Sequence, residues 1–312
     1  SAVSTTGWRE GFEGISTHDI GAAIGFSLFW GLGQATFGHA VALVGPSLAF
    51  ALVVGAQAAI GTLLPELVFH PEDFRTGKGA SLLIGTLLIG VGIYLAYVAG
   101  KRRDHVSLEP ELLDTALLKP QEGPQEAVLH DHSAKVKRFW KGTLLLGLSC
   151  IGAPALNFAL IFARRMNPAL EAAGYNQELS STVPTALVLV TGSIFNVIYP
   201  LAFLFDGEGK TEQFLACDHH TCVCNFSSCC AMAFLFYFSL AALNMGSTLM
   251  GKLGSSIGWA IWVVTVILFS TLAGIYRGEW KDASRSTLRL LLVSQIIQCL
   301  AITVMGLGIA LS

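Results

Sequence analysis

Apolar positions along this chain fall in long runs separated by short polar segments. Each run holds roughly 20 mostly apolar residues, the length that an α-helix needs to cross the hydrocarbon core of a bilayer. Few of the runs show the one-sided apolar stripe of a helix on a soluble protein. We therefore predict eight membrane-spanning helices, at residues 20–43, 46–68, 79–100, 139–162, 181–205, 225–247, 255–276 and 287–310.

The main interruption of this pattern is the polar stretch 101–138, which contains Pro110, Pro120 and Pro124. It has little apolar periodicity, so we expect a flexible loop there and not a folded domain. The sequence thus predicts three parts. Residues 1–100 form part of a first transmembrane repeat, 101–138 a cytoplasmic linker, and 139–312 a second repeat.

The composition is typical of a chain that is embedded in a lipid bilayer. Hydrophobic residues make up 53% and charged residues 13%, with a mean hydropathy of +0.61. Soluble domains carry about 25% charged residues. A net charge of −2 leaves no basic face that could bind nucleic acid. We predict an all-α, polytopic, multi-pass integral membrane protein; nothing distinguishes the plasma membrane from an internal one.

Most of the 19 Lys and Arg residues fall in loops on one side of the predicted bundle. These loops are 101–138, 206–224 and 277–286. Cytoplasmic loops of membrane proteins are enriched in Lys and Arg. We therefore expect this side to face the cytoplasm.

An internal repeat is indicated by helix spacing. The turn at 44–48 resembles the turn at 253–257, and the same offset of 209 residues carries 79–100 onto the last predicted helix. The triples that begin at 20–43 and at 225–247 thus match in order and spacing. Two helices would then be expected before 20–43, outside this chain, which begins at Ser1 without Met. The result is an inverted five-plus-five architecture, which is typical of transporters.

Glycines four residues apart let membrane helices approach closely. Such pairs are Gly21 with Gly25, Gly254 with Gly258, and Gly274 with Gly278. We interpret all three as packing motifs.

Several polar or amphipathic side chains lie inside predicted spans. Polar groups in hydrocarbon must face a partner or a wet cavity, so each either bonds a neighbouring helix or lines a solute path. Amides suit sugar hydroxyls, and Trp rings suit the apolar faces of sugars. The candidate substrate-binding residues are Gln34, His39, Gln57, Asn244, Trp259 and Trp262.

Proton coupling needs a titratable group at membrane depth. His39 is the deep candidate and Glu66, after Pro65, a shallower one. No Asp or Glu lies near the centre of a predicted span, which weakens the case for coupling.

The segment Asp218-His219-His220-x-Cys222-x-Cys224 has zinc-ligand residue types. Its spacing is not that of a standard zinc finger. We favour inert or lipid-modified cysteines, or an error in the coding prediction, and expect no metal. No nucleotide-binding glycine loop and no Ser/His/Asp set is recognisable, so we predict neither enzyme activity nor a cofactor.

Three segments together resemble the L-rhamnose–proton symporter family of the drug/metabolite transporter superfamily. The first is Trp30-Gly31-Leu32-Gly33 with 45–47 and 61–65, the second is 256–261, and the third is 278–285, which reads Gly-Glu-Trp-Lys-Asp-Ala-Ser-Arg. Their order and spacing match from residue 20 to the end of the chain. The stretch 218–230 departs from the family, which is more simply apolar there.

The resemblance implies ten helices and uptake of a deoxy sugar driven by protons. The partners would be L-rhamnose or a related neutral solute, protons and the bilayer. We expect alternating access between two five-helix halves, with the solute near mid-membrane. Two alternatives stay open: a carrier of another metabolite such as a nucleotide sugar, for which Arg164 and Arg165 could supply cations, and a non-transporting membrane scaffold.

Overall fold

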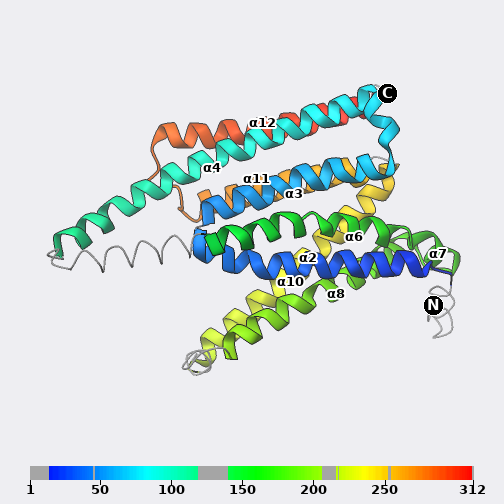
Figure 1. The fold of residues 1–312 in the computed structure, drawn as a ribbon, viewed down its shortest axis with the longest axis horizontal. Helices are drawn as coiled ribbons and strands as arrows, with labels where there is room; N and C mark the ends of the chain where they lie inside the picture. Colours follow the sequence, from blue (N-terminus) through cyan, green and yellow to red (C-terminus); the bar gives the residue numbers. More distant parts are fainter. Residues whose placement is uncertain are drawn as a thin grey trace. The chain divides into compact units, whose positions relative to one another are not determined.

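The computed structural model describes residues 14–44, 46–118, 140–205, 216, 218–251 and 254–310. All regular secondary structure in these residues is helical, as Figure 1 shows. The elements are α2 (Thr17–Val44), α3 (Pro46–Phe69), η1 (Pro71–Arg75), α4 (Gly77–Leu118), α6 (Ala155–Arg164), α7 (Asn167–Ala172), α8 (Gln177–Phe205), α10 (His219–Leu249), α11 (Gly254–Tyr276) and α12 (Arg285–Ala310).

Within the described residues, eight helical segments are long and apolar enough to cross a membrane. Each overlaps one predicted run, so the predicted all-α, eight-span class is confirmed. The segments are Thr17–Val44, Ala49–Phe69, Gly77–Arg103, Trp140–Ala172, Gln177–Ala202, His219–Leu249, Gly254–Tyr276 and Arg285–Gly308.

The fourth span is interrupted. Residues 140–152 are helical, a turn follows at 153–154, and α6 begins behind Pro154. Proline has no backbone N–H, so it ends one helix and suits the start of the next. Every residue of α6 except Arg164 is buried, which places this helix at the centre of its own unit.

Residues 101–118 differ from the expected loop, because they continue α4 without a break. This segment is rich in Leu and also contains Arg and Glu, all of which are good helix formers. The segment is therefore helical because of its helix propensity, although its polarity predicted a loop. Residues 119–139, the rest of the predicted linker, lie outside the described residues.

Helix α10 starts six residues before the predicted run, at His219. The Asp218 carboxylate accepts a hydrogen bond from the Thr221 backbone N–H at 3.1 Å, the geometry of an N-cap. Hydrogen bonds from the Thr221 side chain and backbone hold the pKa of Asp218 below its ordinary value of 3.8. The cap therefore begins the helix in a segment too polar to be recognised as a span.

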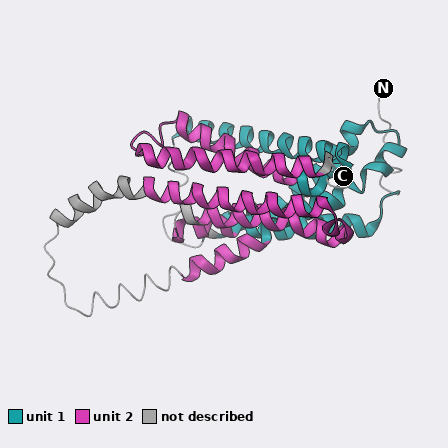
Figure 2. Ribbon diagram, turned by 90° about the horizontal axis from the view of Figure 1, so that it is seen from above, with its two compact units in different colours: residues 1–35, 152–258 teal, residues 36–151, 259–312 magenta. Residues whose placement is uncertain are grey.

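The chain divides into two compact units, coloured in Figure 2. Unit 1 comprises residues 1–35 and 152–258, and unit 2 comprises residues 36–151 and 259–312. This division follows contacts in space and cuts across the predicted repeats, which are consecutive in sequence. The proposed repeat boundaries at 100 and 139 therefore stay a prediction.

In unit 1, α2 crosses its neighbours at glycines. A β-carbon on Gly31 would overlap the main-chain carbonyl of Gly192 in α8, and one on Gly33 would lie 2.9 Å from the Gly152 Cα. Of the predicted motifs in this unit, Gly254 and Gly258 do pack closely, both on Ser247 of α10.

The packing interpretation is wrong for Gly21 and Gly25, because a β-carbon on either would meet no described atom within 4 Å. The close approaches of α2 lie two to three turns further along the helix.

In unit 2, α4 packs against both α3 and α12, and Figure 1 shows α4 and α12 running side by side. Glycines again permit the contact: Gly85 lies on Met305, and Gly92 lies on Gln298. The third predicted motif behaves differently at its two positions. Gly274 lies against the Glu279 and Trp280 side chains, and Gly278 lies in the turn after α11 with φ of 81°.

Candidate functional site

Two of the predicted substrate-binding residues, Gln34 and Asn244, belong to unit 1. Asn244 of α10 is 0% exposed. Its side-chain N–H group donates to the Ser181 carbonyl at 3.0 Å and to the Thr185 hydroxyl at 3.1 Å, both in α8. The Asn244 Oδ1 atom is buried without a hydrogen-bond partner among the described residues. Asn244 thus joins two helices and has one acceptor left, whereas Gln34 is half-buried on α2.

Three further candidates meet in unit 2. The Trp259 Nε1–H group donates to the Gln57 backbone carbonyl at 2.9 Å, and the Trp259 and Trp262 rings lie 5.1 Å apart. A β-carbon on Gly61 would overlap the Trp259 indole, so this glycine makes room for the ring. The structure therefore brings Gln57, Trp259 and Trp262 together, with the Gln57 main chain as the acceptor.

The two proton-coupling candidates also belong to unit 2. Glu66 of α3 is 1% exposed, so its carboxyl is withdrawn from solvent within the unit. His39 lies near the end of α2 and is half-buried. Both take part in interactions within the protein.

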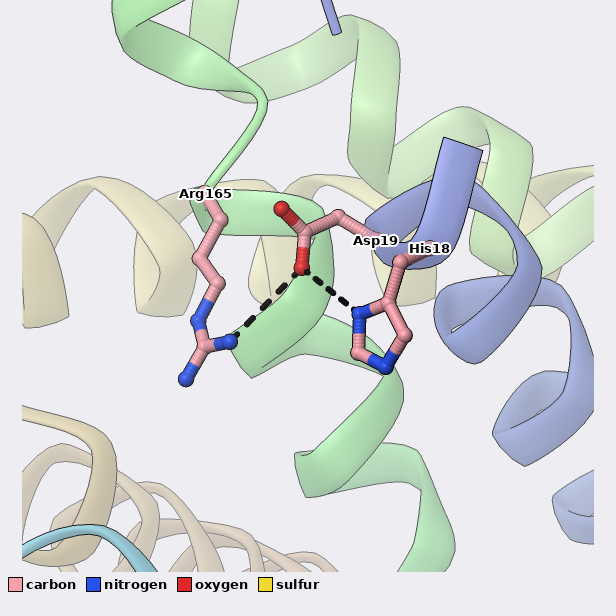
Figure 3. Close-up of polar contacts among 3 residues, drawn as sticks. All are labelled: His18, Asp19 and Arg165. Atoms are coloured by element: carbon pink, nitrogen blue, oxygen red, sulfur yellow. Dashed lines mark ion pairs between the residues drawn. The ribbon is translucent and has the colours of Figure 1, made fainter. Parts of the chain in front are cut away.

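An ion-pair cluster joins the start of α2 to the end of α6 in unit 1 (Figure 3). The Asp19 carboxylate lies 3.5 Å from the His18 Nδ1 and 3.6 Å from an Arg165 guanidinium nitrogen. The Arg165 guanidinium also lies over the Phe162 ring, 4.8 Å from its centroid. These contacts fix the Arg165 side chain between Asp19 and Phe162, so a structural role explains it.

Arg164, the residue beside it, is placed differently. Its Nη2 atom is buried and has no hydrogen-bond partner among the described residues. A cation in that setting is costly unless it meets an anion, so Arg164 is the strongest candidate in unit 1 for contact with a negatively charged group.

Unit 2 also contains a pocket of about 360 Å³ between α3, α4 and α11. Its walls are mostly apolar, with Phe50 and Ile93 among them. At one end the Arg103 guanidinium lies 3.8 Å from the Glu279 carboxylate and 4.8 Å from the centroid of the Trp280 ring. The pocket thus combines apolar walls with one charge of each sign.

No pattern in the sequence indicates this pocket. Glu279 and Trp280 belong to the 278–285 motif, and Arg103 belongs to the Lys- and Arg-rich stretch that starts at residue 101. The motif was the available signal. Its pairing with Arg103 joins residues far apart in the sequence, which no local pattern shows.

The cysteine-rich segment lies at the start of α10. Cys222, Cys224, Cys229 and Cys230 are exposed and form no disulfide among the described residues, and Cys217 lies outside the described residues. The Cys224 Sγ lies 3.8 Å from the His220 Nδ1, one turn away. The described part of the chain contains no group of three or more His, Cys, Asp or Glu side chains that could hold a metal ion.

Comparison with known proteins finds relatives over nearly the whole chain. A protein named L-rhamnose-proton symporter from Yersinia pestis is 21% identical over 290 residues, which cover 91% of this chain and 77% of that protein. One of the same name from Pectobacterium atrosepticum is 22% identical over 289 residues, with the same coverage. No family model and no solved structure matches.

The resemblance noted in the sequence is thereby confirmed at low identity. Symporters are transporters and not enzymes. Together with eight apolar helices, these relatives identify a multi-pass integral membrane protein of the transporter class.

Proposed function

We propose that this transporter, a distant relative of L-rhamnose-proton symporters, carries a small neutral sugar of the L-rhamnose type together with protons. The supporting observation is the continuous alignment over 91% of the chain with proteins of that name. A match over 91% of the chain supports a shared transport unit more strongly than one shared motif would.

The proposed mechanism is alternating access between repeats that bind the solute between them. The make-up of the units supports it. Unit 2 holds α3, α4, α12 and α11 from Trp259 onward, the second and third members of both predicted triples, and unit 1 contains most of α2 and all of α10, the first members. Equivalent helices of two related halves would be expected to segregate in this way.

The proposed sugar contacts are three amides, two indoles and one imidazole, from Gln34, His39, Gln57, Asn244, Trp259 and Trp262. Asn244 Oδ1 offers a buried acceptor, which suits a sugar hydroxyl donor. The Trp262 ring, half-buried beside Trp259, offers an apolar face to the C–H side of a sugar. His39 and Glu66 are the proposed proton carriers.

The test is uptake of radiolabelled L-rhamnose by the full-length protein in proteoliposomes, with and without an inward proton gradient. We expect accumulation above the external concentration only with the gradient, and its collapse on adding a protonophore. Liposomes without protein are the control. Correctly inserted protein that moves no L-rhamnose would refute the rhamnose assignment.

One observation favours a second candidate, a carrier of an anionic metabolite such as a nucleotide-linked sugar. The buried Arg164 Nη2 has no hydrogen-bond partner among the described residues, and an anionic solute would supply one. The matched pair is Arg164→Gln and Arg165→Gln. Loss of anion uptake only in Arg164→Gln supports this candidate, and unchanged rhamnose uptake in both variants excludes a role for either residue in sugar transport.

A further inference from the structure

The pocket of unit 2 lies where three helices reach one membrane boundary. It is lined by the first turns of α3, by α4 up to Arg103, and by the last turns of α11. Arg103 is also the last residue of the third span. The pocket therefore runs from the boundary, at its charged end, into the depth of the hydrocarbon, at its apolar end.

The pocket opens to its surroundings near its charged end, where the second span begins, whereas Ile93, deeper in the third span, is 7% exposed. Phe50, on its wall, is 53% exposed within the structure. Gly100 and Gly274, which have no side chains, also line the pocket. A chain-like apolar ligand that enters sideways would bury these surfaces, at about 25 cal/mol for each Å² removed from water. A small sugar would leave most of that wall uncovered.

The charged end carries Arg103 and Glu279, whose charges cancel. Their separation of 3.8 Å is longer than a hydrogen bond, and their side chains are 26% and 50% exposed, so a ligand can reach both charged groups from outside the protein. The Trp280 ring lies against the guanidinium and fixes its position. A ligand that matches this end needs a negative group for Arg103 and a positive hydrogen-bond donor for Glu279.

We propose that this pocket binds one molecule of phosphatidylethanolamine from the bilayer. The lipid phosphate accepts hydrogen bonds from the Arg103 guanidinium, and the primary ammonium donates to the Glu279 carboxylate. One acyl chain lies along Phe50, Ile93 and Ile267. Phosphatidylcholine has the same charges but no N–H donor, and phosphatidylglycerol has no cation, so neither satisfies both side chains.

The test is native mass spectrometry of the delipidated full-length protein with added phosphatidylethanolamine, phosphatidylcholine or phosphatidylglycerol of identical acyl chains. We expect one bound phosphatidylethanolamine at roughly fivefold higher affinity than the other two lipids, the effect of about one charged hydrogen bond. Binding is measured without transport, so this result stands or falls separately from the sugar assignment.

Variants separate the two ends of the headgroup. Glu279→Gln should lower phosphatidylethanolamine binding to the level of phosphatidylcholine, and Arg103→Gln should weaken all three lipids. Arg102→Gln is the matched control, because Arg102 is the preceding, exposed residue of α4 and lines no part of the pocket. Ala96→Phe should fill the apolar wall and exclude the acyl chain. Size-exclusion profiles identify any variant that fails to fold.

Four outcomes would overturn the proposal. Equal binding of all three lipids means that the pocket does not distinguish between their headgroups. Preference for phosphatidylglycerol, lost in Arg103→Gln, means an anionic-lipid site. Displacement of the bound lipid by L-rhamnose means that the pocket is part of the solute path. Persistent phosphatidylethanolamine selectivity in Glu279→Gln would contradict the proposed role of that carboxylate.

Discussion

Gly31 of α2 packs against the main chain of Gly192 in α8, so closely that a β-carbon on Gly31 would overlap the Gly192 carbonyl oxygen. The Gly192 carbonyl belongs to the helix backbone, so it cannot move away by changing rotamer as a side chain can. Unit 1 therefore depends on the absence of one methyl group at this crossing.

Gly31→Ala should destabilise the protein by about 1–3 kcal/mol or more, the usual cost of forcing extra atoms into a packed contact. The measurement is the thermal unfolding midpoint of the detergent-purified protein. Gly25→Ala is the matched control on the same helix, with no described atom within 4 Å of the added carbon. Since Ala is the better helix former, this control should be neutral or slightly stabilising. Equal midpoints for the two variants would contradict the close crossing.

Asn244→Ala removes two hydrogen bonds from α10 to α8. We expect a loss of about 1 kcal/mol, since hydrogen bonds between membrane helices contribute modestly. Thr185→Val removes one of the two acceptors and serves as the structural comparison. A rise in the KM for sugar in Asn244→Ala but not in Thr185→Val would assign the buried Oδ1 to the solute. The same change in the KM for sugar in both variants would indicate that Asn244 acts only in helix packing.

Gln298 of α12 is 0% exposed, and neither its Nε2 nor its Oε1 has a hydrogen-bond partner among the described residues. Replacing a buried, unsatisfied amide by an apolar side chain of similar shape removes its desolvation cost, about 1–3 kcal/mol. Gln298→Met should therefore raise the unfolding midpoint, while Gln298→Ala should lower it by leaving a cavity. A lower midpoint in Gln298→Met would show that the amide has a partner in the membrane.

The cap of α10 gives a pH dependence with a defined sign. Asp218 has a pKa below its ordinary 3.8 when folded, so its carboxylate contributes fully above that value and less as the pH falls through the lowered pKa. The protection of amides 221–224 against hydrogen exchange, relative to their intrinsic rates at each pH, should fall only in this acidic range. Asp218→Asn keeps an acceptor without titrating and should stay protected throughout. Asp218→Ala should exchange faster at every pH, and a pH-independent wild type would refute the cap.

His39 and Glu66 can be separated by comparing two assays on one set of proteoliposomes. Each residue is replaced by Gln in turn. The variant that lacks the proton carrier should lose gradient-driven accumulation but keep equilibrium exchange of labelled for unlabelled sugar. The other variant should keep both. His70→Gln is the control, because His70 lies at the end of α3 and pairs at 3.7 Å with Glu72. Loss of exchange in both variants would instead indicate a structural role.

The membrane-spanning helices were predictable because length and hydropathy are local properties of the sequence. The predicted run 287–310, for example, lies within two residues of α12 at its start. Helix α10 shows the limit. Its first turns are polar and exposed, so hydropathy placed its start at 225, whereas one carboxylate at 218 begins the helix. A cap depends on a single residue, so a hydropathy value averaged over many residues does not show it.

The candidate site was less predictable. Residue types suggested Gln57 as a binding amide, yet its contribution in the structure is a main-chain oxygen, which every residue has. The pocket was missed for another reason: Arg103 and Glu279 come together only when α4 and the end of α11 pack. Gly31 looked like part of a motif, but its partner, Gly192, could be found only from the helix crossing.

The contact of Trp259 with α3 places different constraints on residues 57 and 61. The indole bonds the backbone of residue 57, so any side chain there leaves that bond intact, whereas a side chain at Gly61 collides with the ring. Among homologues, residue 61 should stay small wherever 259 is Trp, and the two should change together. Residue 57 should drift freely, unless its amide is kept for the solute.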